Sequence, residues 1–578
     1  MNKFRLEPLA FIKWIVMSIV VVLMLQTFSI QVLNQKTYQS KTKDMVVRSR
    51  NVYAERGQIM DRNGVVLADN LRDTANKVLD YSRIFLQGKL ASQIVGKLDF
   101  NGHGNMGMER VFDSRLTGVE GFRVSVQDVR HREIYSRSEN VAEAEPGKNL
   151  VLTIDRDMQE IVEKALKDGV NEFSAASASA VVVDPYTGEI LAMASYPTFD
   201  PNSKKQGVGR MAKNDIVAMS YEPGSTFKAI TAAAALEDDI VSPEKVFENE
   251  GKCWRWNAKS EPICDTHIYG DMDMGEAMVQ SSNIVFAKIA AEVGADKLYR
   301  MARNFGFGMK TSENLYGEES GRLYMPYELT RDERTLKTMG FGHAVSVTPI
   351  QMVMAYAAVA NGGTLMEPMI VKEWRDSDGN LVEKKEPVKV RRVISERTAA
   401  SIRKMLNRVV NSGTAKRVAS KKIPDVLFGG KTGTAEKYNQ ETGKYDREHQ
   451  VASFIGLAPV EDVRYVCMVL VDDPNADKLY GHTGGATAGP IFRRIMEGIY
   501  YHPTLSPASH ELALVSENSP CKGDYVGLHV DAAKMHAQSR HCSVTFEGAG
   551  NRVISSRRAK SDSLSLVLTQ RQSLLQVL

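Results

Sequence analysis

The chain has 578 residues, of which 43% are hydrophobic and 25% are charged. This ordinary composition excludes a mostly disordered protein, a collagen-like fibre and a small disulfide scaffold, and a mean hydropathy of −0.27 argues against a multi-span membrane protein. The net charge of +4 gives no strong basic field that would indicate a nucleic-acid partner.

An uncharged apolar stretch at residues 14–35 predicts one membrane-spanning helix, because about 20 such residues cross a bilayer core. The alternatives are a buried core helix and a cleaved signal peptide, although no A-x-A cleavage site follows the stretch. More basic residues follow the span than precede it, so the positive-inside rule does not favour a cytoplasmic N-terminus. We still assign residues 1–13 to a cytoplasmic tail, because large domains cross membranes largely regardless of flanking charge.

The next segments alternate in character. Residues 46–149 are polar, and Asn63-Gly64 beside an apolar run predicts a hairpin. Asp155 is placed to cap a helix with an apolar face. Strands are expected at residues 151–154, 179–183, 189–194, 451–456 and 463–471, around a helical middle and before a helix that follows Pro490. This order predicts one α/β or α+β domain over residues 150–502.

Beyond this domain the composition shifts. Residues 503–520 are rich in proline and serine and are interpreted as a linker. Residues 521–570 carry a short helical pattern at 532–537 and alternating strands at 543–546 and 564–568. They predict a small α/β module.

Three short motifs could carry chemistry. In the first, Ser225 follows Pro223-Gly224 and opens a helical, alanine-rich run, where free N–H groups favour developing negative charge. Lys228 lies one turn later on the same face and could act as a base if its surroundings are partly dry. Ser-x-x-Lys occurs elsewhere in the chain, so this motif alone is also compatible with a solvated helix face.

The second and third motifs supply the context. Ser281 and Asn283 flank one turn before an apolar helix, although an ordinary helix cap would look the same. Lys431-Thr432-Gly433-Thr434 is expected on a strand, where the lysine offers a fixed charge for a carboxylate and the glycine permits close backbone approach. A polar hairpin strand is the alternative for this segment.

Together and in this order, the three motifs are the signature of active-site-serine penicillin-interacting enzymes. The chain resembles a class B penicillin-binding protein of the cell-division type, a peptidoglycan D,D-transpeptidase. Residues 56–64 resemble the opening motif of that family's pedestal, and residues 340–349 and 481–490 resemble two further family stretches. The tail at 521–570 resembles a degenerate PASTA domain, with Arg557 to Lys560 departing from the family pattern.

The resemblance implies a multidomain fold. It comprises a single N-terminal transmembrane helix, a β-rich pedestal at 46–149, a transpeptidase domain at 150–502 with a sheet flanked by helices and an all-α subdomain, and the PASTA-like module. The pedestal is short for the family, and there is no room for a glycosyltransferase domain. The implied location is the bacterial inner membrane, with the catalytic domain on the periplasmic side.

The resemblance also assigns roles. Ser225 would attack the penultimate D-Ala carbonyl of a stem peptide, with backbone N–H groups of Ser225 and Thr434 as the oxyanion hole. An amine of a neighbouring stem peptide would resolve the acyl-enzyme, and β-lactams would acylate Ser225. The implied catalytic residues are Ser225, Lys228, Ser281, Asn283 and Lys431, and the implied substrate-binding residues are Thr432, Gly433 and Thr434. No metal or organic cofactor is expected.

The expected partners are peptidoglycan stem peptides, β-lactams, a multi-span lipid II polymerase and division proteins, without nucleic acid. The alternatives are an elongation-type transpeptidase, a serine β-lactamase and a catalytically silent division scaffold. Three states remain open for Cys253 and Cys264: a local disulfide, free buried thiols, or a zinc site with Asp265 and His267.

Overall fold

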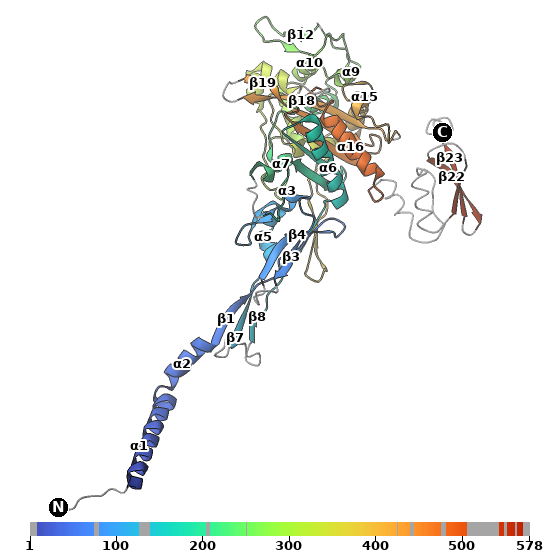
Figure 1. The fold of residues 1–578 in the computed structure, drawn as a ribbon. Coiled ribbons are helices and arrows are strands. Elements are labelled where there is room, and N and C mark those ends of the chain that lie inside the picture. The colour runs from blue at the N-terminus through green and yellow to red at the C-terminus, as the bar shows by residue number, and fades with distance from the viewer. Residues whose placement is uncertain are drawn as a thin grey trace, which may run out of the picture.

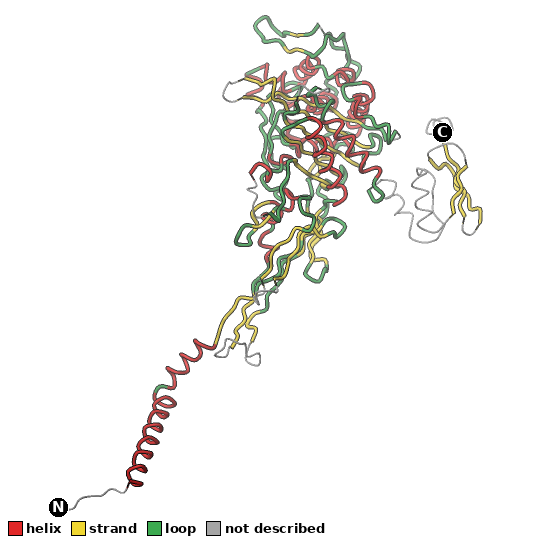
Figure 2. Tube along the Cα trace, viewed as in Figure 1, coloured by secondary structure: helices red, strands yellow, loops and turns green. Residues whose placement is uncertain are grey.

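The computed structural model describes residues 8–73, 80–126, 139–203, 209–249, 251–424, 426–439, 444–475, 481–505, 543–547, 552–560 and 563–569. N-terminal helices lead into a slender, strand-rich pedestal, and the pedestal leads into a larger body of mixed helices and strands (Figures 1 and 2). Body here means residues 150–502, and pedestal means residues 46–149. The mixed α/β architecture confirms the predicted fold class.

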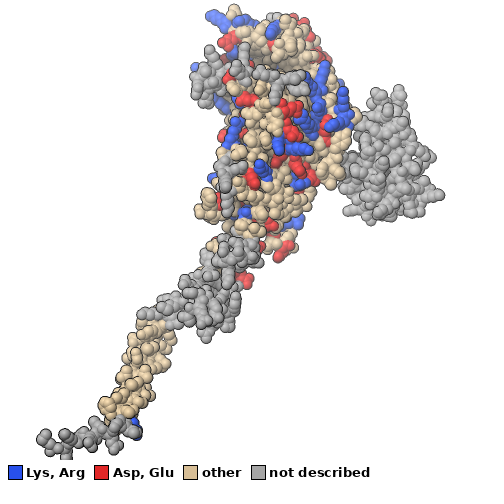
Figure 3. Space-filling model, in the orientation of Figure 1, with Lys and Arg blue, Asp and Glu red and all other residues tan. Residues whose placement is uncertain are grey.

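Three helical segments begin the described chain: α1 (Pro8–Phe28), the π-helical η1 (Ser29–Leu33) and α2 (Gln35–Val46). Residues 10–33 are the one stretch among the described residues that is long and apolar enough to cross a membrane, and none of it is buried in the protein. Figure 3 shows this segment as an almost uncharged surface. Because its apolar side chains are exposed, the core-helix alternative is wrong.

The pedestal begins with a three-stranded antiparallel sheet in the order β1 (Val47–Val52), β7 (Gly121–Val126), β8 (Glu139–Ala142). Beyond it lie the small elements α3 (Ser92–Val95), β5 (Lys97–Leu98), β6 (Gly104–Met106), α4 (Gly107–Val111) and α5 (Asp113–Thr117). The predicted hairpin is present, and Gly64 takes the positive φ of +85° that its turn requires.

A six-stranded sheet joins pedestal and body. Its order is β16 (Leu381–Lys384), β15 (Val371–Arg375), β9 (Asn149–Leu152), β2 (Ile59–Met60), β3 (Val66–Asp73) and β4 (Asp80–Phe85). The pairing of β2 with β9 is parallel, and the other pairings are antiparallel. The sheet therefore crosses the boundary predicted at residue 150.

Buried charged side chains stabilise the pedestal, and Arg115 connects it to the body. Glu109 is fully buried, and its two carboxylate oxygens accept from Arg56 Nε and Arg83 Nε at 2.7 Å each. On the other side, the Arg115 guanidinium lies 4.0 Å from the ring centre of the buried Trp374. Arg115 also donates to Glu383 Oε2 at 2.9 Å, so its side chain links the pedestal to two residues of the body.

The core of the body is a five-stranded antiparallel sheet in the order β11 (Ile190–Tyr196), β10 (Ser177–Val183), β20 (Tyr465–Asp472), β19 (Lys444–Ala458) and β18 (Gly429–Asn439). Helices α6 (Arg156–Phe173) and α16 (Ala488–Tyr501) pack on each other and on the sheet, whose strands also contact α14 (Pro349–Ala360) and α15 (Glu396–Ser412). Asp155 caps α6 as predicted, accepting from the N–H groups of Asp157 and Met158.

Between β11 and β18 the chain is mainly helical, as predicted. The remaining elements there are η3 (Gly209–Ala212), α7 (Asp215–Ala218), η4 (Gly224–Phe227), α8 (Lys228–Glu237), β12 (Cys253–Trp254), β13 (Ile263–Cys264), α9 (Met274–Gln280), α10 (Asn283–Val293), α11 (Ala295–Asn304), α12 (Pro326–Arg331), α13 (Glu333–Met339), β14 (Thr364–Met366), β17 (Lys389–Arg392) and η5 (Lys416–Val418). Helix α8 is buried over almost its whole length, because small alanine side chains allow neighbouring helices to approach closely.

The described tail is a three-stranded sheet in the order β21 (Ser543–Glu547), β23 (Ser563–Thr569), β22 (Arg552–Lys560). Two of these strands match the predicted ones, and β22 was not predicted. The helix expected at 532–537 and most of the linker expected at 503–520 lie outside the described residues.

Candidate active site

Ser225 lies in the short 3₁₀ helix η4, directly before α8. Its backbone is tightly enclosed. The Gly224 N–H donates to Gly342 O at 3.0 Å, and a Cβ on Gly342 would lie 2.0 Å from Gly224 O. A Cβ on Gly433 would lie 2.9 Å from Pro223 O, so β18 touches the other side of the same turn. These close approaches hold Ser225 in one position.

Lys228 is the first residue of α8, and its side chain is fully buried. Its Nζ donates to Ser281 O at 2.6 Å, to Asn283 Oδ1 at 2.9 Å and to Ser281 Oγ at 3.2 Å. Burial, and then the nearby charge of Lys431, lower the pKa of Lys228 well below its ordinary value. The lysine is thus poised to be a neutral amine, the form that can accept a proton.

Ser281 is the centre of the cluster. Its Oγ donates to Ser225 Oγ at 3.0 Å and accepts from Lys228 Nζ at 3.2 Å and from Lys431 Nζ at 2.9 Å. One donated and two accepted bonds use the full capacity of a hydroxyl group. Among the described residues, the hydrogen-bonded connection from Lys228 to Ser225 therefore runs through Ser281.

The backbone geometry explains how Ser281 reaches this position. It ends α9 in the left-handed conformation, with φ of +62°, and the next residue, Ser282, caps α10 by accepting from Val285 N–H. A non-glycine residue with positive φ is uncommon and tends to occur at functional sites. The sharp turn between two helices lets both Ser281 and Asn283 contact Lys228.

Lys431 projects from β18 and is fully buried. Besides Ser281 Oγ, its Nζ donates to Thr432 O at 3.3 Å and to Thr432 Oγ1 at 3.4 Å. Burial lowers the pKa of Lys431 to about 7. This ammonium group has no carboxylate partner among the contacts given for it, which suits a group that meets an anionic ligand.

The other residues of the third motif line the same strand. Thr432 Oγ1 lies 3.0 Å from Thr414 Oγ1, and Thr434 Oγ1 accepts from Gly484 N–H at 3.2 Å. Strand β18 is at one edge of the five-stranded sheet. An edge strand leaves alternate backbone groups unpaired, so an extended peptide could pair with it beside Ser225.

Cys253 and Cys264 form a disulfide across the short hairpin β12–β13. The zinc and free-thiol alternatives are therefore wrong for this pair. Asp265 does not face a metal but accepts hydrogen bonds from the start of α10, and the described residues hold no cluster of His, Cys, Asp and Glu that could bind one. Sequence reasoning weighed Asp265 only as a zinc ligand and missed its contact with the second motif.

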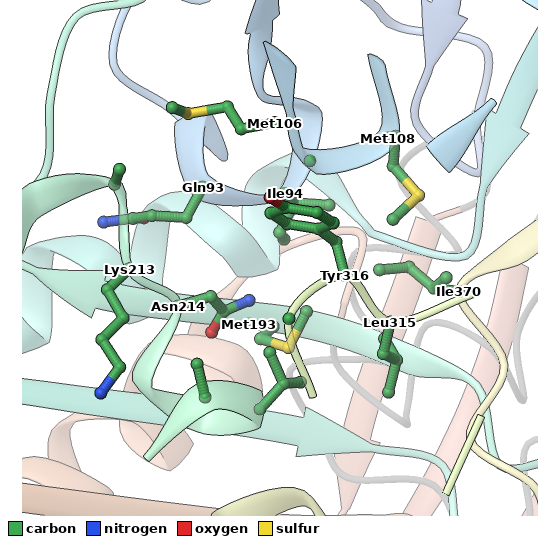
Figure 4. Close-up of a pocket in the computed structure, with 15 residues that line it drawn as sticks. Gln93, Ile94, Met106, Met108, Met193, Lys213, Asn214, Leu315, Tyr316 and Ile370 are labelled. Carbon is green, nitrogen blue, oxygen red and sulfur yellow. The ribbon is translucent and has the colours of Figure 1, made fainter. Parts of the chain in front are cut away.

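A separate small cavity of about 120 Å³ lies at the junction of pedestal and body (Figure 4). Its walls are mainly apolar, and Figure 4 shows Tyr316, Met106 and Met108 around it, with Lys213 and Asn214 to one side. None of the motif residues lines this cavity.

Comparisons with known proteins identify the family of the chain. The family described as penicillin binding protein transpeptidase domain matches residues 178–497, more than half of the chain. Stage V sporulation protein D of Bacillus subtilis is 32% identical over 80% of this chain and 70% of that protein. Peptidoglycan D,D-transpeptidase FtsI of Buchnera aphidicola is 29% identical over 74% of this chain and 70% of that protein.

Among solved structures, penicillin binding protein 3 of Mycobacterium tuberculosis in complex with aztreonam has a TM-score of 0.68 and 31% identity, covering 78% of this chain and 96% of that one. The family match covers the residues of the serine–lysine cluster. The chain belongs to the penicillin-binding protein transpeptidase family.

Proposed function

We propose that this protein is a serine-type peptidoglycan D,D-transpeptidase that cross-links stem peptides and is acylated by β-lactams. The observation that carries the proposal is Ser281 Oγ, which bonds to Ser225 Oγ and to two buried lysines at once. A nucleophile, a buried lysine whose pKa is lowered well below its ordinary value and a second buried lysine thus meet in one cluster. The names of the related proteins support the same reaction.

In the first step, Ser225 Oγ attacks the carbonyl carbon of the penultimate D-Ala. Its proton passes to the Lys228 amine, either directly or along Ser281 Oγ, whose present bonds already join the two groups. The backbone N–H groups of Ser225 and Thr434 stabilise the oxyanion, which is often the largest catalytic contribution. As the C–N bond breaks, Ser281 delivers the proton to the leaving D-Ala amine.

Substrate recognition falls to the remaining cluster residues. Lys431, with the hydroxyl groups of Thr432 and Thr434, orients the terminal carboxylate, while Gly433 permits close approach of the strand. Asn283 holds the amide of the stem peptide. The edge position of β18 supports an extended binding mode for the peptide.

In the second step, an amine from a neighbouring stem peptide attacks the acyl-Ser225 ester and forms the cross-link. The β-lactam ring mimics the terminal dipeptide and leaves an acyl group that water removes slowly. A serine β-lactamase would need a base to activate that water, and the contacts given for the cluster include no carboxylate on Ser225 or Ser281. A silent scaffold would not need two buried lysines.

The cellular setting follows from the apolar N-terminal helix. We place the chain as a single-pass protein of the bacterial inner membrane, with residues 14–35 as anchor and the body on the periplasmic side. A multi-span lipid II polymerase and division proteins are its proposed partners, and a septal role is favoured over an elongation role. The PASTA-like assignment of residues 521–570 and the domain boundaries remain proposals.

The test is intact-mass analysis of the full chain in detergent after incubation with penicillin, beside Ser225→Ala. Ser401→Ala is the matched control, because Ser401 belongs to another Ser-x-x-Lys sequence and donates only to Arg397 O on the exposed side of α15. A stable adduct on the parent and on the control, but not on Ser225→Ala, supports the proposal. No adduct with intact drug supports a scaffold, and no adduct with consumed drug supports a β-lactamase.

A further inference from the structure

Asp265 follows the disulfide-closed hairpin and is only 4% exposed. Its Oδ1 accepts from Asn283 N–H at 2.5 Å and from Ile284 N–H at 3.2 Å, and its Oδ2 accepts from Ser282 Oγ at 2.7 Å and from Asn249 Nδ2 at 3.4 Å. Three of these four donors belong to the first residues of the second motif and its helix. The Asp265 carboxylate therefore holds the start of α10 by hydrogen bonds.

This contact is a helix cap supplied from another segment. The first N–H groups of a helix have no partner within it, and a carboxylate at that end is stabilised by the helix dipole. Ser282 caps α10 from its own side by accepting from Val285 N–H. Asp265 adds acceptors for Asn283 and Ile284, so the first turn of α10 is held by two caps.

The double cap matters because the neighbouring turn is strained. Ser281 has a positive φ of +62°, a conformation that is unfavourable for a non-glycine residue. That conformation aims Ser281 Oγ and Asn283 Oδ1 at Lys228 Nζ. The Asn283 side chain is held further by donating to Cys264 O at 3.3 Å, directly beside Asp265.

We propose that Asp265 is a positioning residue for the acylation reaction, clamping the turn between α9 and α10 so that Ser281 and Asn283 stay on Lys228. The proposal for this clamp, meaning Asp265 and its hydrogen bonds to Ser282, Asn283 and Ile284, rests on the function proposed above. It extends the site beyond its three motifs. Its carboxylate touches neither the nucleophile nor the substrate in this arrangement, and it acts through the residues it holds.

Asp265 also contributes charge. Its carboxylate raises the pKa of Lys228, opposing burial and the charge of Lys431, which both lower it. His343 is a further ionisable group near Lys228, and burial lowers its own pKa to about 4, so it is neutral over the working range. Removing the Asp265 charge should therefore make the neutral Lys228 amine available at lower pH.

The experiment measures the second-order rate of acylation of the full chain in detergent by a fluorescent penicillin, between about pH 5 and 9. Asp265→Asn keeps the shape and an acceptor oxygen but removes the charge, whereas Asp265→Ala removes both. Asp273→Asn is the matched control, because Asp273 caps α9 by accepting from Glu276 N–H and is not among the groups that act on Lys228. Thermal melting checks that each variant is folded.

We expect Asp265→Asn to lower the plateau rate about tenfold and Asp265→Ala about 100-fold, since a misplacement near 1 Å costs that much. In both variants the acid limb of the profile should move to lower pH, because the Asp265 carboxylate raises the pKa of Lys228. The control should change neither. If the stably folded Asp265→Asn keeps the parental plateau and acid limb, or if Asp273→Asn changes both equally, the proposal is overturned.

Failure of the proposed function is distinguishable from failure of the clamp. If the parent forms no adduct, the function is refuted, and the clamp is refuted with it. If the parent is acylated at Ser225 and the Asp265 variants match it, only the clamp is refuted. A loss of rate in Asp265→Ala without a shift of the acid limb, together with an unaffected Asp265→Asn, would indicate a merely structural residue.

Discussion

The two buried lysines predict an unusual pH dependence of acylation. For the reaction, Lys228 must be neutral to accept a proton, while Lys431 must be charged to hold a carboxylate. Burial lowers the pKa of Lys431 from 10.5 to about 7. A change of this size corresponds to roughly 5 kcal/mol against the charged form in the folded protein.

The acylation rate should fall at alkaline pH. In the free protein, Lys431 loses its proton as the pH rises through about 7, so the second-order acylation rate should fall about tenfold per pH unit above that point. At about pH 9 the rate should be roughly 100-fold below its maximum. An ordinary lysine would keep the rate level to about pH 10.

Lys431→Arg separates this explanation from others, because a guanidinium group stays charged at all accessible pH values. Each protein is compared with itself as the ratio of rates at about pH 7 and 9, so that an overall difference in rate between the two proteins cancels. We expect a ratio of roughly 50 for the parent, because about half of Lys431 is charged at pH 7 and about 1% at pH 9, and a ratio near unity for the variant. A parental midpoint above about pH 9, or the same alkaline limb in both proteins, would refute the reasoning.

Three further changes test other parts of the structure. Lys431→Met should raise the melting temperature, and by more at about pH 6 than at about pH 9. Because burial lowers the pKa of Lys431, the charged amine destabilises the folded state at low pH. This destabilisation decreases as the pH rises and the amine loses its proton. Differential scanning calorimetry at both pH values checks this, and a loss of stability would contradict it. Glu109→Ala should destabilise the protein by about 3–5 kcal/mol, since the buried Arg83 would lose the carboxylate that pairs with it; denaturant unfolding that shows less than about 1 kcal/mol would disprove this. Gly342→Ala should abolish penicillin labelling, because its Cβ would lie 2.0 Å from Gly224 O; labelling at the parental rate would show that the turn can relax.

Much of the site could be predicted because its reactive residues belong to short local motifs. Ser225 precedes a buried helix, Ser281 and Asn283 flank a turn, and Lys431 lies on a strand, all as local patterns indicated. Spacing alone could not show that Ser281 would be the shared partner of three groups. That result depends on a positive φ that nothing in the serine itself signals.

Other features depend on contacts between distant segments, and local patterns do not encode these. Asp265 reaches a helix that begins 18 residues later, and the only sequence signal was its place beside two cysteines. The six-stranded sheet combines segments from residues 59–85, 149–152 and 371–384. The domain boundary predicted from composition at residue 150 therefore falls inside a sheet whose backbone hydrogen bonds continue across it. In the tail, β22 contains several basic residues and has no clear alternation, which concealed it.

The shared sheet has a mechanical consequence. Any pull on the membrane anchor reaches the body along β1 and then through the parallel pair β2–β9, whose hydrogen bonds would be loaded in shear. Strand β9 leads within four residues into α6, which packs on the five-stranded sheet that carries Lys431. Force from the envelope would thus be transmitted to the framework of the reactive cluster through backbone pairing, whereas a flexible tether would absorb it.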